Sequence, residues 1–208
     1  MKNLHVIDHP LIKRDISMLR DKSTTSEDFR IVLRRLTSLM VFDVTKDLRL
    51  SSYKIETPLE LTEGYATADE VILVPVLRAG LGMLEAYLSF IPNAKVGHIG
   101  LYRDEATLKP VDYYAKFPPN LSKSFVIVID PMLATGGSAV AAIQYLKDRE
   151  AANIRLSCIV AAPEGVALLE KAHPDVPVYA AVLDRELNKH GYILPGLGDA
   201  GDRIYGTL

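Results

Sequence analysis

The sequence predicts an α/β protein built on a parallel, doubly wound sheet flanked by helices. From Val71 onward, short apolar runs rich in β-branched residues alternate with segments of helical periodicity, the pattern of successive βαβ units. The run Phe125–Ile129 contains no polar residue, as expected for a strand buried on both faces. The chain has 208 residues, of which 49% are hydrophobic, enough to bury a core of its own. We therefore expect one domain over residues 1–208.

Two helices are expected before this alternation begins. Residues 10–22 predict a short helix, and a second helix should start near Thr24, where Thr24 and Glu27 have the spacing of a capping box. Apolar residues of the second helix form one stripe, which must pack on the domain or on another subunit. The stripe comprises Phe29, Val32, Leu33, Leu36 and Met40. Residues 52–57 predict a short edge strand or a ribbon, so an N-terminal helical arm of about residues 1–60 would precede the first core strand.

The alternating region should supply the strands and helices of the sheet. The expected strands are 71–76, 96–102, 125–129, 154–161 and 178–183, and the expected helices are 79–90, about 140–147 and 164–172. A long polar insert at about 103–122 predicts a functional or flexible loop. After residue 183 the chain becomes glycine-rich, and we expect a separate irregular segment at about 184–208.

Composition argues against several kinds of partner. The net charge is −2, so no overall positive field would attract nucleic acid. No apolar stretch approaches the ~20 residues of a membrane span, and the first residues lack the layout of a signal peptide. The single cysteine, Cys158, cannot form an intrachain disulfide and is best explained as a small buried hydrophobic residue. A cytoplasmic location is expected.

One stretch carries most of the predicted chemistry, and it contains the residues IDPMLATGGS. Asp130 follows a buried strand, and ligands bind outside the carboxyl ends of strands in parallel sheets. Gly136 and Gly137 allow close approach of the backbone, while the helix N-terminus with Thr135 and Ser138 suits a phosphate. Asp130 is better suited to sugar hydroxyls or to a metal-held water. The alternative is an ordinary turn in which Ser138 caps the helix; the chemistry favours a phosphorylated sugar across the strand end.

This stretch resembles the phosphoribosyl diphosphate (PRPP) motif of the type I phosphoribosyltransferases, and in particular that of the uracil phosphoribosyltransferase family. The resemblance extends from His9 to Thr207 and includes three motifs in the family's order. It implies transfer of a phosphoribosyl group from PRPP to uracil, giving UMP and diphosphate in pyrimidine salvage, with Mg²⁺ carried by PRPP. The implied PRPP-binding residues of the motif are Asp130, Pro131, Met132, Leu133, Ala134, Thr135, Gly136, Gly137 and Ser138.

The match includes one departure from the wider superfamily. That superfamily usually has two adjacent acids at the start of the motif, whereas Asp130 is followed here by Pro131. This departure is typical of the uracil branch. One carboxylate, and not two, is then available to the ribose hydroxyls.

Two arginines are implied to contact PRPP. Arg78 lies in a Leu-Arg-Ala-Gly turn after the strand 71–76 and resembles the family's pyrophosphate-binding loop, although a solvated charge at a strand end would look the same. Arg103 opens the polar insert and matches the PRPP-contacting arginine of the family's flexible catalytic loop, although a salt-bridged hinge is the simpler explanation. Lys109 is a weaker candidate. Asp130, Arg103 and Asp199 are the implied catalytic residues.

The glycine-rich C-terminal segment resembles the family's uracil-recognition hood. A loop of this kind can offer backbone N–H and C=O groups to a flat heterocycle. Carried over by position, Ile193, Gly198, Asp199 and Ala200 contact uracil, and Asp199 also serves PRPP or its Mg²⁺ shell. His190 lies near the hood, but neither it nor His173, expected as a surface cation at a helix end, has the spacing of a catalytic or metal-binding residue.

Two other functions agree less well with the sequence, and two further properties are expected. An RNA-binding regulatory protein with the same fold would need a basic face, and a dinucleotide-binding oxidoreductase would need a GxGxxG turn directly after one of the expected strands, where none occurs. Some relatives are activated by GTP, so a GTP activator is a further expectation from the resemblance. The striped N-terminal arm predicts a homo-oligomer, either a dimer or a tetramer.

Overall fold

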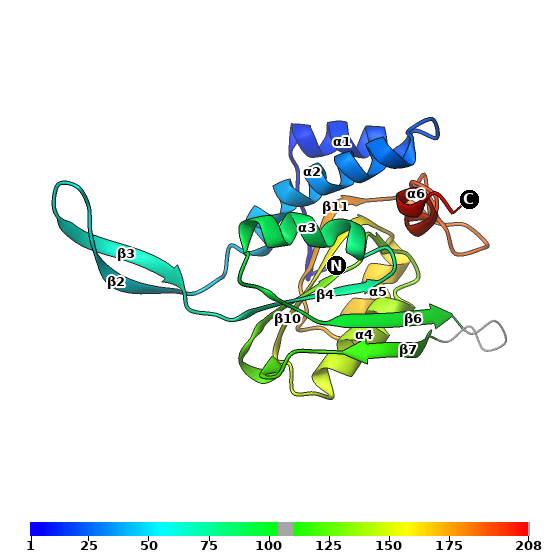
Figure 1. Cartoon of the computed structure of the whole chain (residues 1–208). Helices are drawn as coiled ribbons and strands as arrows, with labels where there is room; N and C mark the ends of the chain where they lie inside the picture. The colour runs from blue at the N-terminus through cyan, green and yellow to red at the C-terminus, as the bar shows by residue number, and fades with distance from the viewer. Residues whose placement is uncertain (104–109, 208) are drawn as a thin grey trace.

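The protein is a mixed α/β molecule organised around one mainly parallel sheet (Figure 1). The computed structural model describes residues 1–103 and 110–207. The strand order across the sheet is β1-β11-β10-β8-β4-β6-β7, with β5 paired to β4 and β9 paired to β10. Only β7 runs antiparallel to its neighbour among the pairs of this sheet in the described residues. The predicted fold class is confirmed.

The strands of the main sheet follow the expected alternation. They are β1 (Leu4–Val6), β4 (Val71–Leu77), β5 (Lys95–Val96), β6 (His98–Arg103), β7 (Pro110–Lys116), β8 (Phe125–Ile129), β9 (Met132–Leu133), β10 (Asn153–Ala161) and β11 (Val178–Leu183). Two further pairs are separate from it: β2 (Leu50–Glu56) with β3 (Leu61–Thr67), and β12 (Glu186–Leu187) with β13 (Ile193–Leu194).

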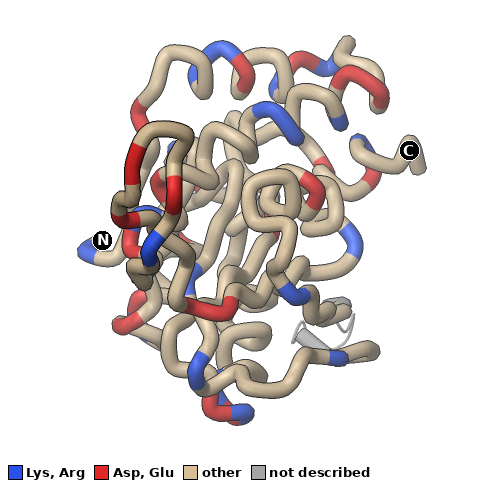
Figure 2. Tube along the Cα trace, turned by 60° about the vertical axis from the view of Figure 1, so that its left-hand side comes forward, with Lys and Arg blue, Asp and Glu red and all other residues tan. Residues whose placement is uncertain are grey.

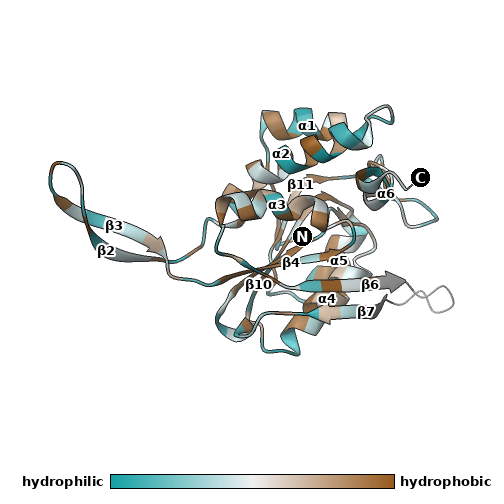
Figure 3. Cartoon of the chain, viewed as in Figure 1, coloured by the Kyte–Doolittle hydropathy of each residue, from teal (hydrophilic) through white to brown (hydrophobic). Residues whose placement is uncertain are grey.

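Helices cover both faces of the sheet. They are α1 (Pro10–Arg20), α2 (Ser26–Val44), α3 (Leu81–Phe90), α4 (Gly137–Lys147), α5 (Pro163–Ala172) and α6 (Ala200–Tyr205), and a 3-10 turn, η1, spans Leu121–Lys123. Alternate residues of β8 belong to two separate hydrophobic clusters, Ile127 packing with α1, α2 and α3 and Val128 packing with α4 and α5. Figure 3 shows the hydrophobic residues concentrated on these central strands. The strand is apolar throughout because both of its faces are covered.

The N-terminal stripe is buried within the same chain. All five of its residues are at most 2% exposed, and they pack against the sheet and α3. Of the two partners that the sequence allowed, the domain itself is therefore the correct one. The predicted capping residue was wrong by one position: Thr25 caps α2 by accepting a hydrogen bond from the Asp28 N–H, and the Thr24 hydroxyl instead donates to the Met18 carbonyl.

The strands at the two ends of the main sheet, β1 and β7, are not among those expected from the sequence. The strand β1 precedes both helices and pairs in parallel with β11, so the expectation that the helices come before the first core strand was wrong. Much of the polar insert is also ordered: residues 110–116 form β7, which pairs with β6. The stretch contains several polar residues because β7 lies at the end of the sheet, where one edge has no partner strand among the described residues.

The ribbon expected near residues 52–57 is one half of a long hairpin. The strands β2 and β3 pair along their whole length and reach away from the body of the molecule (Figure 1). The hairpin exposes several large apolar side chains, of which Leu59 is 96% and Leu61 71% exposed. The alternative of a single edge strand of the main sheet was wrong.

Two single-residue expectations have opposite outcomes. Cys158 is fully buried, as predicted. His173 is also buried, and its Nε2 lies 3.2 Å from the Val140 carbonyl oxygen, so it is not the expected surface cation. His173 is the C-cap residue of α5, and α5 packs against α4. The periodicity of a single helix does not show which neighbouring helix covers its last residue. No helix in the described part of the chain is long and apolar enough to cross a membrane.

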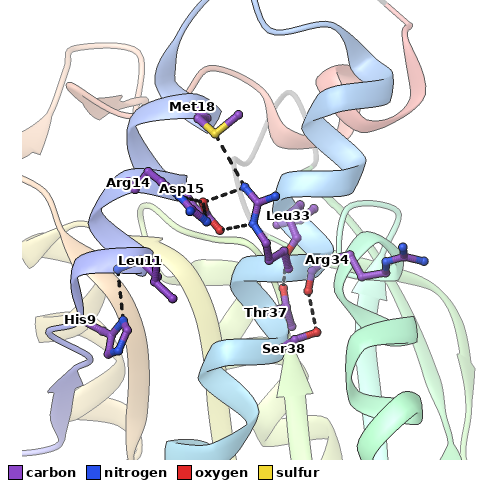
Figure 4. A network of polar contacts seen from close by, with 10 residues as sticks. His9, Leu11, Arg14, Asp15, Met18, Leu33, Arg34, Thr37 and Ser38 are labelled. Atoms are coloured by element: carbon purple, nitrogen blue, oxygen red, sulfur yellow. Dashed lines mark hydrogen bonds and ion pairs between the residues drawn. The ribbon is translucent and has the colours of Figure 1, made fainter.

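A buried carboxylate joins the first two helices. Asp15 of α1 is completely buried and accepts hydrogen bonds from Nε and Nη2 of Arg35 on α2, each at 2.8 Å, and from Nε of Arg14 at 2.9 Å (Figure 4). Burial acts to raise the pKa of Asp15, but the hydrogen bonds from Arg35 and Arg14 outweigh it and leave the pKa lowered. The ionised form is therefore the one that holds α1 to α2.

We expect Asp15→Asn to lower the free energy of unfolding by about 1–3 kcal/mol, because an amide cannot accept the same set of charge-assisted bonds. The matched control is Asp8→Asn, which removes an exposed pair with Lys13 and should change the free energy by less than about 0.5 kcal/mol. Chemical denaturation of both variants measures the difference. Because the pKa of Asp15 is lowered, its contribution is present above the unfolded pKa near 4 and lost as the pH falls through the folded value. If Asp15→Asn and Asp8→Asn lower the free energy of unfolding by the same amount, Asp15 does not hold α1 to α2.

Candidate active site

The carboxyl ends of three neighbouring strands meet at one edge of the sheet. The central strand β8 lies between β4 and β10 and is parallel to both, with Leu73 opposite Ile127 and Leu156 opposite Val128. The segments that follow the strands therefore lie side by side at this edge. Asp130 comes directly after β8, and Arg78 comes directly after β4. The register thus brings together two of the predicted motifs.

Two adjoining cavities open at this edge. The larger, about 340 Å³, is lined by Ala79, Asp130, Met132, Ala134, His190, Gly191, Tyr192, Ile193, Gly198, Asp199, Ala200 and Gly201. The smaller, about 100 Å³, is lined by Asp130, Met132, Leu133, Ala134, Thr135, Gly136, Ser138 and Ala139. Three residues line both, so the predicted phosphate-binding loop and the predicted hood are parts of one continuous site. Asp130 is the ionisable residue among the three.

Asp130 is held where the two cavities meet. Its backbone N–H donates to the Ser157 carbonyl of β10 at 3.1 Å, and its Oδ1 accepts from the Met132 N–H at 3.2 Å. Burial of the carboxyl group raises its pKa to about 7, and the hydrogen bond from Met132 opposes that shift in part. The residue nevertheless remains partly exposed to the cavities. A carboxylate that is short of hydrogen-bond donors suits a ligand that brings hydroxyl groups.

The loop after Asp130 is fastened to β10 and leads into α4. The Pro131 carbonyl accepts hydrogen bonds from two N–H groups of β10, and β9 pairs with the end of the same strand. Gly136, at the N-cap of α4, has a φ of 84°, and a Cβ there would lie 2.8 Å from the Gly165 carbonyl oxygen. No side chain caps α4, so the alternative of Ser138 as its cap was wrong. The first-turn N–H groups of α4 face the end at which a phosphate would bind.

The turn after β4 depends on a close approach of the backbone. A Cβ at Gly80 would lie 2.4 Å from the Ile129 carbonyl oxygen, so no larger residue fits between β4 and β8. Arg78 precedes this turn and is exposed, with Nη2 3.6 Å from a carboxylate oxygen of Asp202. Its guanidinium also lies 5.7 Å from the Tyr205 ring centroid. A cation held this loosely, beside the larger cavity, can turn toward an anionic ligand.

The hood residues come together as predicted, from an irregular segment and the start of α6. Ile193 is buried in β13, and Ala200 is buried at the first position of α6. Asp199 caps α6 by accepting from the Asp202 N–H at 2.9 Å, yet it stays exposed in the cavity. Gly198 has a φ of 81°, which favours glycine. The four predicted uracil-binding residues therefore line one cavity with Asp130.

Some residues of the site were not predicted individually. Gly191, Tyr192 and Gly201 line the cavity within the hood range, and Ala79 lines it beside Arg78. His190 also lines it but is exposed, and nothing in its surroundings gives it a chemical role. The side chains of Arg103, at the end of β6, and of Lys109 lie outside the described residues.

No protein cage for a metal is found in the described ranges. Within residues 1–103 and 110–207, no three or more His, Cys, Asp and Glu side chains are grouped so that they could hold a metal ion. Asp130 and Asp199 both line the larger cavity. Because Mg²⁺ is commonly held by one or two carboxylates together with substrate phosphates, this donor set fits a Mg²⁺ that arrives with a diphosphate.

The family profile and the similar named proteins both point to one family. The profile of the family described as uracil phosphoribosyltransferase matches residues 6–207. Proteins named uracil phosphoribosyltransferase from Acidovorax ebreus and Macrococcus caseolyticus are 53% and 54% identical to this chain over 208 residues, covering all of each protein. A solved protein from Aquifex aeolicus is 36% identical, with a TM-score of 0.91 and 97% of each chain covered.

A more distant structure shares the fold alone. An adenine phosphoribosyl transferase from Trypanosoma brucei is 16% identical, with a TM-score of 0.60 over 92% of this chain and 88% of its own. The family profile, by contrast, spans the PRPP-like motif, the turn after β4 and the hood, which the structure gathers around one pair of cavities. This chain therefore belongs to the uracil phosphoribosyltransferase family.

Proposed function

We propose that the protein transfers the phosphoribosyl group of PRPP to N1 of uracil, giving UMP and diphosphate in pyrimidine salvage. The observation that supports this proposal is the continuity of the two cavities, which open at Asp130 between the N-terminus of α4 and the glycine-rich C-terminal segment. The full-length match to the family supports it. The direct test is formation of UMP from uracil and PRPP by the purified protein.

The arrangement suggests where each part of the substrates binds. The phosphate of PRPP fits the smaller cavity, which Thr135 and Ser138 line at the N-terminus of α4, where the first backbone N–H groups of a helix suit an anion. The ribose then lies beside Asp130, which can accept hydrogen bonds from its hydroxyls. The base enters the larger cavity toward Ile193 and Gly198. The two substrates would thus meet over Asp130.

The reaction requires positioning and charge stabilisation more than proton transfer. As the bond from C1′ to the diphosphate oxygen breaks, C1′ develops positive charge, N1 of uracil forms the new bond, and the N1 proton passes to solvent water or to the departing diphosphate. The Asp130 carboxylate is suited to orient the ribose and to stabilise that positive charge. Mg²⁺ carried by PRPP would neutralise the diphosphate as it leaves, and Asp199 is suited to hold a water of its shell.

The diphosphate is assigned to the arginines at the strand ends. Arg78 is suited to exchange its loose contact with Asp202 for the diphosphate. Arg103 is included because its motif resembles the family's catalytic loop and because β6 is the parallel neighbour of β4. Arginine suits both positions because its guanidinium can bind two phosphate oxygens at once.

Three further properties remain predictions. A homo-oligomer is supported by the exposed apolar side chains of the hairpin β2–β3, since large apolar patches often mark interfaces. Activation by GTP rests on the family resemblance, and a cytoplasmic location rests on the composition. Charges of both signs are interspersed over the molecule (Figure 2), which argues against a surface devoted to RNA. The mass of the protein in solution tests the homo-oligomer, and turnover with and without GTP tests the activation.

Asp130→Asn should lower kcat by roughly tenfold or more, because the amide keeps the shape but loses the charge that supports the developing cation. The wild-type kcat/KM for PRPP should also rise with pH through about 7, as Asp130 loses its proton. In Asp130→Asn only the titration of the substrate phosphate, near pH 6, should remain. The control Asp175→Asn alters an exposed carboxylate paired with Lys147 and should leave both properties unchanged. An unaltered pH profile in Asp130→Asn would remove this residue from the mechanism.

Arg78→Ala should raise the KM for PRPP by about tenfold while leaving the KM for uracil within about twofold, because it removes a charge-assisted contact to one substrate only. The matched control is Arg149→Ala, which removes an exposed arginine that lies over the Tyr145 ring. Steady-state kinetics with each substrate varied in turn separate the two KM values. Parallel changes in both values would show that Arg78 acts on the fold and not on the diphosphate.

The base specificity follows from a pocket built on backbone groups. Uracil offers two carbonyl acceptors beside an N3–H donor, whereas cytosine has an amine in place of O4 and an acceptor at N3. Leaving buried polar groups unpaired costs roughly 1–3 kcal/mol each, and sites of this kind discriminate by about 10⁴ or more. We expect cytosine to be a very poor substrate and 5-fluorouracil, which keeps the same edge, to be accepted. Comparable kcat/KM values for cytosine and uracil at saturating PRPP would exclude this recognition mode.

A further inference from the structure

Charged side chains bind both backbone polar groups of Gly196, a residue of the hood; one comes from the start of the C-terminal segment and the other from α1. The Gly196 N–H donates to Oδ2 of Asp184 at 2.9 Å, and the Gly196 carbonyl accepts from Nη1 of Arg20 at 2.8 Å. Asp184 follows β11, and Arg20 is the last residue of α1. A single residue of the hood is thus fixed both to the end of β11 and to the end of α1.

The two side chains also bind each other. Nη1 of Arg20 donates to Oδ2 of Asp184 at 2.8 Å, and Nη2 donates to Oδ1, so the pair is bidentate. The side chain of Asp184 is 3% exposed and that of Arg20 23% exposed, so the contact is shielded from solvent and salt. Such a planar pair has a defined orientation, which lysine could not reproduce.

The turn that this pair fixes lies between residues that line the cavity. Gly196 has a φ of 61°, and a Cβ there would lie 2.2 Å from the Ile193 carbonyl oxygen. The backbone is therefore folded back tightly between Ile193 and Gly198, both of which line the larger cavity. A change in the orientation of Gly196 would move both sides of that lining.

The same pair relates the hood to the PRPP-like motif. The Asp184 N–H donates to the Ala161 carbonyl at the end of β10 at 2.8 Å. Ala161 is in turn the parallel partner of Leu133 in β9, within the motif. The position of the hood relative to the phosphate-binding loop is therefore set through Asp184 by a short series of hydrogen bonds.

We propose that Arg20 and Asp184 are positioning residues for base recognition: together they hold the Gly196 turn so that the hood backbone presents its groups to uracil at a fixed distance from PRPP. Neither residue lines the cavity, so neither touches the base. The inference rests on the proposed function and adds to it a residue pair that acts only through the hood. Loss of the pair affects the binding of uracil and leaves the PRPP-binding loop in place.

The test compares Arg20→Lys with Arg30→Lys. Arg30 also joins an N-terminal helix to the C-terminal segment, since its Nη1 donates to the Ile204 carbonyl at 2.8 Å, but it does not touch the Gly196 turn. We expect Arg20→Lys to raise the KM for uracil about tenfold while the KM for PRPP stays within about twofold, because the forked contact is lost. Arg30→Lys should leave both values unchanged. Asp184→Asn is a second variant and should act in the same direction as Arg20→Lys.

A second readout does not depend on catalysis. Hydrogen exchange of the peptide containing residues 193–198, measured without substrates, should be faster in Arg20→Lys than in Arg30→Lys, because Asp184, which accepts from the Gly196 N–H, is no longer held by the forked contact with Arg20. Absence of UMP formation by the wild-type protein would contradict the proposed function itself. If the wild-type protein forms UMP normally, the proposed function stands. In that case an unchanged KM for uracil in Arg20→Lys, or an unchanged exchange rate of the 193–198 peptide, would overturn the role of the Arg20–Asp184 pair. Equal increases in both KM values would likewise overturn it.

Discussion

The site depends on the parallel alignment of β4, β8 and β10. Because these strands run in the same direction and are covered by helices on both faces, their carboxyl ends coincide at one edge. The segment after each strand then has little freedom: Gly80 must pass against the Ile129 carbonyl, and the loop after Asp130 is bonded along β10. The chemistry of the protein is therefore located by strand register, before any individual side chain is considered.

The surroundings of two aspartates explain why one stabilises the fold while the other is suited to bind a ligand. Asp15 and Asp130 are both shielded from water, yet the pKa of Asp15 is lowered and that of Asp130 is raised to about 7. Asp15 is surrounded by guanidinium groups of Arg14 and Arg35, whereas Asp130 accepts one backbone hydrogen bond in the described residues and opens into the cavities. The first has its full set of donors within the fold. The second has room in the cavities for donors from a ligand, which agrees with the substrate-binding role proposed for it.

Arginines fasten the C-terminal segment to the N-terminal helices. Besides Arg20, Arg203 of α6 donates to the Leu197 carbonyl at 2.9 Å and to the Asp21 carbonyl at 2.7 Å, and it lies 4.5 Å from the Phe29 ring centroid. Apolar side chains of the hood, such as Leu197 and Ile204, join the hydrophobic core, but its irregular backbone leaves many polar groups to be satisfied. Long cationic side chains meet this need, since their heads donate hydrogen bonds while their stems pack. The N-terminal helices therefore contribute to the site without lining it.

The sequence by itself determined the α/β class, the main strands of the sheet and the three motifs, because these depend on local patterns. Buried strands are apolar, helices have a period of 3.6 residues, and phosphate loops need adjacent glycines. Only the tertiary structure decided that β1 joins the sheet beside β11, that His173 is buried against α4 and that Arg20 binds Asp184. Arg20 and Asp184 are 164 positions apart, and neither has a neighbour in sequence that indicates a partner. Contacts of this kind are set by packing, which brings distant residues together with no local signal in the chain.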